Sequence, residues 1–364
     1  MIIEREVNYM ANKKRFLSPL LTALVLSLTL GIGSVGVQAD DSSDNINRIG
    51  GSDRIGTADQ VALDLFGTSQ NVVLVNGYGY ADAVSATPLA KQLNAPILLT
   101  SGEDALESQV SLTMDNLHVS NVYIVGGSGV VSQSIEDSLK AKYGTEHVQR
   151  IEGTTDTTRM GTNAAVAQKV LDKTGKKSAI LVNGQDGYAD SLSVASVAAQ
   201  EGYPVLFANS TEVPDVVKDI VTSNNLSNIK AVGGSGVLPE AVVNSVNGTK
   251  ITQDSNMLNR FATNLAVLNY FKSSLKFDNV YVAAGGATSN QFADALVASA
   301  AAAKTDSPLV LSGVGANQTQ IDNARDYVLS NTDPDTSKIT IIGGTASVSQ
   351  AIEDSFTFSI IGIE

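Results

Sequence analysis

Three acidic and three basic residues recur at matching places along the chain and are its first candidates for chemistry. Each Asp stands in an aromatic-Ala-Asp triplet just past an apolar run, at the edge where open α/β sheets bind ligands. A carboxylate there accepts hydrogen bonds from sugar hydroxyls. It also stabilises a helix N-terminus or pairs with an arginine as a clamp on the fold. The candidate ligand-binding residues of this kind are Arg54, Asp82, Arg159, Asp190, Arg260 and Asp294.

Tyrosines lie beside two of these Asp residues. Tyr80 and Tyr188 begin their triplets, and Tyr78 lies in the same loop as Tyr80. Carbohydrate sites often place an aromatic face against a sugar ring, so Tyr80 and Tyr188 are also candidate ligand-binding residues. The alternative is that each ring packs over its own helix.

A glycine pair follows an apolar run in each copy. Gly126-Gly127-Ser128-Gly129 stands between an expected strand and an expected helix, as phosphate-binding loops do. It lacks both the glycine spacing of a dinucleotide loop and the lysine of a P-loop. A sharp strand-to-helix turn that needs positive φ or close packing is the alternative, and we favour it.

Composition argues against several functional classes. The chain has no Cys, which excludes thiol catalysis and Cys-ligated zinc. His118 and His147 are its only histidines and are not repeated, and neither a Gly-x-Ser-x-Gly elbow nor a His-Glu-x-x-His pair occurs. The net charge of −13 disfavours nucleic acid and anionic lipid as partners. We therefore expect no catalytic residue, metal site, cofactor or nucleic-acid partner.

The landmarks recur three times in one order, which indicates three copies of one unit. In every copy, a Pro stands 14 positions after the triplet Asp, and it is Pro96, Pro204 or Pro308. Helix-like segments alternate with short apolar runs, the pattern of a small doubly wound, mainly parallel sheet. Short joins between the copies favour a compact pseudo-threefold assembly. The expected modules are residues 46–146, 147–249 and 250–364.

A short strand is expected to complete each sheet. Val148 to Ile151 is the example for the first sheet, and Phe358 to Ile361 is its counterpart at the end of the chain.

Residues 1–39 have the layout of a secretory signal peptide. Lys13, Lys14 and Arg15 precede an apolar run from residue 17 to 32, and Val37-Gln38-Ala39 gives a cleavage site. Translation starts at Met1 or Met10. We expect a secreted protein with no membrane span after cleavage.

Together these landmarks resemble the cell wall-binding repeat type 2 family of Gram-positive surface proteins. The resemblance rests on Arg48-Ile49-Gly50-Gly51-Ser52-Asp53-Arg54, Tyr80-Ala81-Asp82-Ala83, Ala95 to Leu99 and Val122 to Gly127. It implies three Rossmann-like modules that pack as a pseudo-trimer and anchor a protein noncovalently to the wall. The family links a Pro-Ile-Leu-Leu strand to anchoring, which makes Ile97, Leu98 and Leu99 candidate ligand-binding residues.

The expected function is noncovalent binding to cell wall polysaccharide or to an anionic secondary wall polymer, without enzymatic activity. The alternatives are an exported enzyme on a Rossmann-like scaffold and a structural or adhesive surface-layer component. An enzyme would concentrate unusual polar residues in one copy, whereas here they are spread over three, which suits repeated weak binding. An acidic protein binds an anionic polymer through hydroxyls, through local arginines or through bridging divalent cations.

Overall fold

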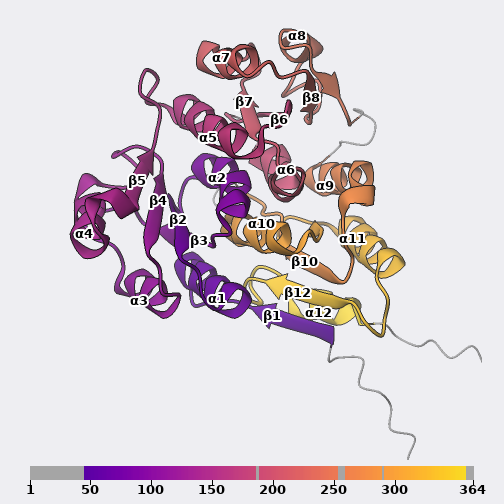
Figure 1. The fold of residues 1–364 in the computed structure, drawn as a ribbon. Helices are drawn as coiled ribbons and strands as arrows, with labels where there is room; N and C mark the ends of the chain where they lie inside the picture. The colour runs from indigo at the N-terminus through magenta and orange to yellow at the C-terminus, as the bar shows by residue number, and fades with distance from the viewer. Residues whose placement is uncertain (1–44, 186–187, 253–258, 289–290, 358–364) are drawn as a thin grey trace, which may run out of the picture. The chain divides into compact units, whose positions relative to one another are not determined.

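A computed structural model describes residues 45–185, 188–252, 259–288 and 291–357 (Figure 1). Module 1 contains β1 (Ile46–Ile49), α1 (Arg54–Phe66), β2 (Asn71–Asn76), α2 (Tyr80–Leu93), β3 (Ile97–Thr100), α3 (Ser108–Asn116), β4 (Asn121–Val125) and α4 (Gln133–Tyr143). Module 2 contains β5 (Val148–Ile151), α5 (Arg159–Thr174), β6 (Ser178–Asn183), α6 (Tyr188–Glu201), β7 (Val205–Ala208), α7 (Asp215–Ser223), β8 (Asn228–Ala231) and α8 (Glu240–Asn244). Module 3 contains β9 (Thr249–Lys250), α9 (Arg260–Tyr270), β10 (Asn279–Ala284), α10 (Ala293–Thr305), β11 (Leu309–Ser312), α11 (Gln318–Asn331), β12 (Lys338–Ile342) and α12 (Gln350–Ser355).

Local sequence explains where these elements begin and what they bury. The Asp53 carboxylate caps α1 by accepting a hydrogen bond from the Gly56 N–H at 2.7 Å. The apolar run of β2 is buried on both faces, as expected for a strand covered by helices on both sides of a parallel sheet. Helix α2 ends at Asn94, because the φ of this residue, 48°, lies in the left-handed region and does not continue the helix.

Each module builds a four-stranded sheet whose pairings are all parallel. The strand orders are β3-β2-β4-β5, β7-β6-β8-β9 and β1-β12-β10-β11. Every sheet therefore borrows an edge strand from another module, β5 from module 2, β9 from module 3 and β1 from module 1. In Figure 1 the indigo β1 lies beside the yellow β12, and Ile46 is in register with Ile339. The first described strand thus completes the sheet of module 3.

Arg48 fixes this closure. From β1, its Nε donates a hydrogen bond to Glu353 Oε2 at 3.0 Å, on α12. Its two Nη atoms donate to the carbonyl oxygens of Gly343 at 2.7 Å and Val348 at 2.9 Å. One guanidinium thereby ties the first strand to the Gly-Gly turn and to the last described helix.

Arg150 makes the equivalent contact in module 1. From β5, its Nε donates to Glu136 Oε2 on α4 at 2.6 Å, and its Nη1 donates to the Gly126 carbonyl at 2.8 Å. Between modules 2 and 3, Lys250 Nζ on β9 lies 3.7 Å from Glu240 Oε1 on α8. At all three joints, a basic residue on the edge strand therefore lies beside a glutamate on a helix of the module whose sheet that strand completes.

Helices α2, α6 and α10 pack against one another and join the three modules. They are buried around most of their circumference, as expected for helices rich in small apolar residues. The Tyr80 and Phe292 rings meet edge to face, with centroids 6.0 Å apart. One apolar core consequently contains residues from all three modules.

The expectation of α/β modules with small parallel sheets is confirmed, and so is the strand Val148 to Ile151. Residues 358–361 lie outside the described residues. The place beside β12 that we had assigned to them is occupied by β1. The signal peptide also lies outside the described residues and stays a prediction, as do the module boundaries. Within the described part of the chain, no helix is both long and apolar enough to cross a membrane.

Candidate functional site: clefts between modules

Each recurring Asp stands in the first turns of a helix and packs against a glycine turn of its own module. Gly126 has φ 115°, and a Cβ placed on it would lie 2.7 Å from Asp82 Oδ2. Gly343, with φ 110°, meets Asp294 in the same way. The first glycine of the pair therefore provides both a left-handed turn and space for a carboxylate. The turn interpretation of the Gly-Gly motif is confirmed.

Each recurring Arg opens its helix, as expected, and binds a backbone carbonyl of its own module. The carbonyl belongs to the glycine that directly follows β2, β6 or β10. The distances from Arg Nη1 to that oxygen are 2.8 Å for Arg54 and Gly77, 3.5 Å for Arg159 and Gly184, and 3.0 Å for Arg260 and Gly285. This bond ties the helix start to the loop that precedes the Asp helix.

The Asp of one module faces the Arg of the next. The electrostatic neighbours are Asp82 with Arg159, Asp190 with Arg260, and Asp294 with Arg54. Burial raises the pKa of Asp82 to about 6 against the opposing charge of Arg159. Burial also raises the pKa of Asp190 to about 6, opposed by Thr263 and Arg260. Each of these Asp carboxyl groups therefore lies within the electrostatic influence of an arginine from another module.

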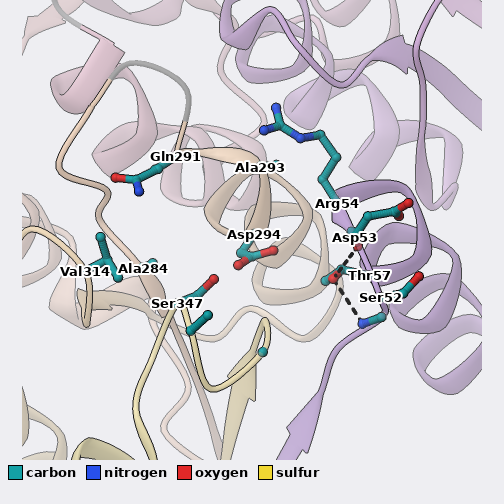
Figure 2. Close-up of a pocket in the computed structure, with 13 residues that line it drawn as sticks. Ser52, Asp53, Arg54, Thr57, Ala284, Gln291, Ala293, Asp294, Val314 and Ser347 are labelled. Carbon is teal, nitrogen blue, oxygen red and sulfur yellow. Dashed lines mark hydrogen bonds between the residues drawn. The ribbon is translucent and has the colours of Figure 1, made fainter.

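The joint between modules 3 and 1 holds a cleft of about 330 Å³, here called the 3/1 cleft. Figure 2 shows Asp294 and Ser347 of module 3 opposite Asp53 and Thr57 of module 1. Burial raises the pKa of Asp294, while the Ser347 side chain and nearby arginines lower it. The Thr57 hydroxyl accepts a hydrogen bond from the Gly51 N–H at 3.1 Å, which shapes the turn that follows β1.

The joint between modules 1 and 2 holds a similar cleft of about 390 Å³, here called the 1/2 cleft. Asp82 of module 1 and Arg159 of module 2 line it, together with Tyr78, Val130 and residues of the loop before α5. Both clefts have the size of small-ligand sites, with a few convergent polar groups. At the joint between modules 2 and 3, the corresponding loops include residues 186–187 and 253–258. These residues lie outside the described residues.

Tyr80 is 9% exposed and connects two modules. Its hydroxyl donates to the Gly184 carbonyl at 2.8 Å, and the Arg159 guanidinium lies 5.5 Å from its ring centroid. It lines the 1/2 cleft with part of its surface while packing between modules. The side chain of Tyr188 lies outside the described residues, so the prediction for it is unchanged.

The Pro-Ile-Leu-Leu strand lies in the core. Ile97, Leu98 and Leu99 form β3 and are at most 2% exposed, and α1 covers that strand. Side chains buried to this degree have no surface to offer a polymer. Their prediction as ligand-contacting residues does not fit this structure, and we assign them to holding the module together.

A buried asparagine supports the corresponding strand in the other two modules. Asn163 Nδ2 donates to the Val205 carbonyl at 2.8 Å, and its Oδ1 accepts from the Phe207 N–H at 2.9 Å. Asn264 makes the same pair of bonds to β11. Neither asparagine is among the residues predicted from the sequence, although both stand four positions after the recurring Arg.

Residues 48–136, 150–243 and 258–353 match the family described as Cell wall binding domain 2 (CWB2). The N-acetylmuramoyl-L-alanine amidase LytC of Bacillus subtilis (strain 168) is 32% identical over 342 residues, which are 94% of this chain and 63% of LytC. The amidase enhancer of the same strain is 28% identical over 86% of this chain and 41% of its own length.

Two solved structures share the fold. Cwp6 from Clostridium difficile has a TM-score of 0.72 and 26% identity, covering 86% of this chain and 48% of Cwp6. Cwp8 from Clostridium difficile has a TM-score of 0.71 and 27% identity, covering 86% of this chain and 52% of Cwp8. This chain thus spans less than two thirds of each of these four proteins. The resemblance stated above is confirmed: the three matched segments cover most of the chain, which belongs to the Cell wall binding domain 2 (CWB2) family and carries three copies of that domain.

Proposed function

We propose that this protein binds a cell wall polymer noncovalently through the clefts between its modules, and is thereby held at the surface of a Gram-positive cell. The observation that carries this proposal is the repetition of one Arg and Asp arrangement at successive joints, with the two charges supplied by different modules. Repeated sites on one rigid unit suit a repeating polymer, because linked weak contacts raise the overall affinity. The family membership supports the same conclusion.

The chemistry of the clefts suits a polymer rich in hydroxyl groups. A carboxylate such as Asp82 accepts hydroxyl protons, and the neighbouring Arg159 offsets its charge. The excess of acidic residues over the whole chain opposes binding of a dense polyphosphate, so recognition of sugar hydroxyls best explains how this protein engages a wall. Export through the predicted signal peptide, residues 1–39, brings the protein there. We propose no enzymatic activity for this chain.

Cosedimentation with purified sacculi tests the proposal. The protein is mixed with sacculi before and after chemical removal of secondary wall polymers, and the bound fraction is measured. We expect saturable binding that falls when the polymers are removed. No binding, or binding that is unchanged by the treatment, contradicts the proposal.

A cleft-filling variant assigns the binding to the joints. A Cβ on Gly129 meets nothing within 4 Å, and Gly129 lines the 1/2 cleft, so Gly129→Leu fills the cleft while leaving the fold intact. Gly344→Leu does the same at the 3/1 cleft. Thr222→Leu, on the exposed surface of α7, is the matched control. Each cleft variant should lower the bound fraction, whereas the control should not.

A further inference from the structure

Tyr78 exposes an aromatic ring at the rim of the 1/2 cleft. It is 59% exposed, and Val130 beside the same cleft is 39% exposed. In the described part of the chain only two other large hydrophobic side chains, Leu112 and Tyr270, are exposed. Two of these four exposed side chains therefore lie at the same cleft. Exposed apolar surface of this kind often marks a binding site.

The Tyr78 ring is held in place before any ligand arrives. The Arg54 guanidinium carbon lies 4.4 Å from its ring centroid, and Arg54 is itself bonded to the Gly77 carbonyl. The Tyr78 N–H donates to Asn76 Oδ1 at 2.7 Å. Because Arg54 covers one face and most of the residue is still exposed, the opposite face of the ring is open. A fixed aromatic surface loses little conformational entropy on binding.

The opposite wall is held by the same asparagine. Asn76 Nδ2 donates to the Val130 carbonyl at 2.7 Å, so one side chain positions both apolar residues. Asp82 and Arg159 supply the polar groups of the cleft. The cleft thus combines an apolar platform, an apolar wall and a charged pair.

Among the described residues that line the 3/1 cleft, none is aromatic. Ser347 occupies there the position in the glycine turn that Val130 holds in module 1, and Gln291 is a further polar lining residue. The two described clefts share the Arg and Asp arrangement and differ in the rim. The side chains at the rim, Tyr78 and Val130 in one cleft and Ser347 and Gln291 in the other, therefore offer a ligand different contacts at the two joints.

We infer that Tyr78 is a stacking platform for a pyranose ring, and that the polymer bound in the 1/2 cleft is a glycan rather than a chain of alditol phosphates. A pyranose presents one apolar C–H face and a rim of hydroxyls, which matches a ring platform beside a carboxylate. An alditol phosphate chain has no ring to stack, and its phosphates are disfavoured by an acidic protein. The inference rests on the proposed function and specifies its ligand class.

Substitutions at Tyr78 test the platform. Affinity is measured for two probes, a phosphate-free glycan released from purified sacculi and a synthetic poly(glycerol phosphate). Tyr78→Ala should weaken binding of the glycan about tenfold, whereas Tyr78→Phe should keep the wild-type affinity. Tyr270→Ala is the matched control, because Tyr270 is 47% exposed with the Lys230 ammonium 5.1 Å from its ring centroid, and it lines neither cleft.

Fluorescence gives a second readout that does not depend on loss of binding. The natural sequence has no Trp, so Tyr78→Trp introduces a single tryptophan at the platform. Its emission should change when the glycan is added and should not change with poly(glycerol phosphate). Thermal melting of every variant checks the fold.

The outcomes separate this inference from the proposed function. If the wild-type protein binds sacculi and Tyr78→Ala binds the glycan as tightly as Tyr270→Ala does, the platform is wrong and the proposed function stands. If the emission responds to poly(glycerol phosphate) alone, the glycan assignment is overturned. If the wild-type protein does not bind sacculi at all, the proposed function itself fails.

Discussion

Removing Arg48 tests the closure of the last module by the first strand. The side chains of Arg48 and Glu353 are 17% and 14% exposed, so the ion pair is largely shielded from water. Arg48→Ala deletes this pair and the hydrogen bonds to the Gly343 and Val348 carbonyls, and it leaves the Glu353 carboxylate without that cation. Losing one partner of a buried pair costs roughly 3–5 kcal/mol, and the remaining exposure places the expected loss near the lower end of this range.

Hydrogen exchange locates the loss. Although Arg48 belongs to module 1 by sequence, protection should fall in β12 and α12 of module 3 and persist in β2. Arg150→Ala is the matched variant, because Arg150 makes the same contact with Glu136 in module 1. Its loss should appear in β4 and α4. If Arg48→Ala lowers protection more in β2 than in β12, the proposed closure is refuted. The same holds if both variants lose protection in the same strands and helices.

Three further predictions concern stability. Asp59 is 6% exposed, and burial raises its pKa to about 6. The neutral carboxyl therefore stabilises the folded protein fully below pH 4, and this stabilisation is lost as the pH rises through 6. Asp59→Asn should therefore raise the melting temperature at pH 8 and not at pH 4, with a gain of up to about 3 kcal/mol. Burial raises the pKa values of Asp82 and Asp190 to about 6 as well. Replacing both with Asn should therefore reduce the change in the free energy of unfolding in urea between pH 4 and pH 7. A change as large as that of the wild-type protein contradicts the raised pKa values. Gly126→Ala should lower the stability to urea by about 2 kcal/mol or more, because φ is 115° and Asp82 fills the space; a neutral effect contradicts the packing described.

The repeat and its elements were predictable because their signals are local. The run from Val72 to Val75 follows directly from its buried, two-sided environment. The triplet Asp residues follow from their place after a strand and at a helix start. These features depend on neighbours within about ten residues, so sequence patterns report them.

The partners of these residues were not predictable, because they lie far away in the chain. Ile46 pairs with Ile339, and nothing local in β1 distinguishes that partner from a strand of its own module. We placed residues 358–361 at that edge because they follow the last helix. The same limit applies to the charges. The sequence shows that Arg and Asp recur, whereas the structure shows that Asp82 faces Arg159 of the following module.

Closure of the fold and ligand binding are coupled at one joint. Gly51, Ser52, Asp53 and Arg54 line the 3/1 cleft and directly follow β1, so a displaced β1 removes one wall of that cleft. The 1/2 cleft takes no lining residue from this segment and meets it only through Arg54, which packs on Tyr78. Arg48→Ala should therefore weaken binding to sacculi as Gly344→Leu does, and adding Gly344→Leu to it should cause little further loss. Adding Gly129→Leu should reduce binding well below either single variant, because it also fills the 1/2 cleft. Equal losses from both combinations would show that the joints do not bind the polymer independently.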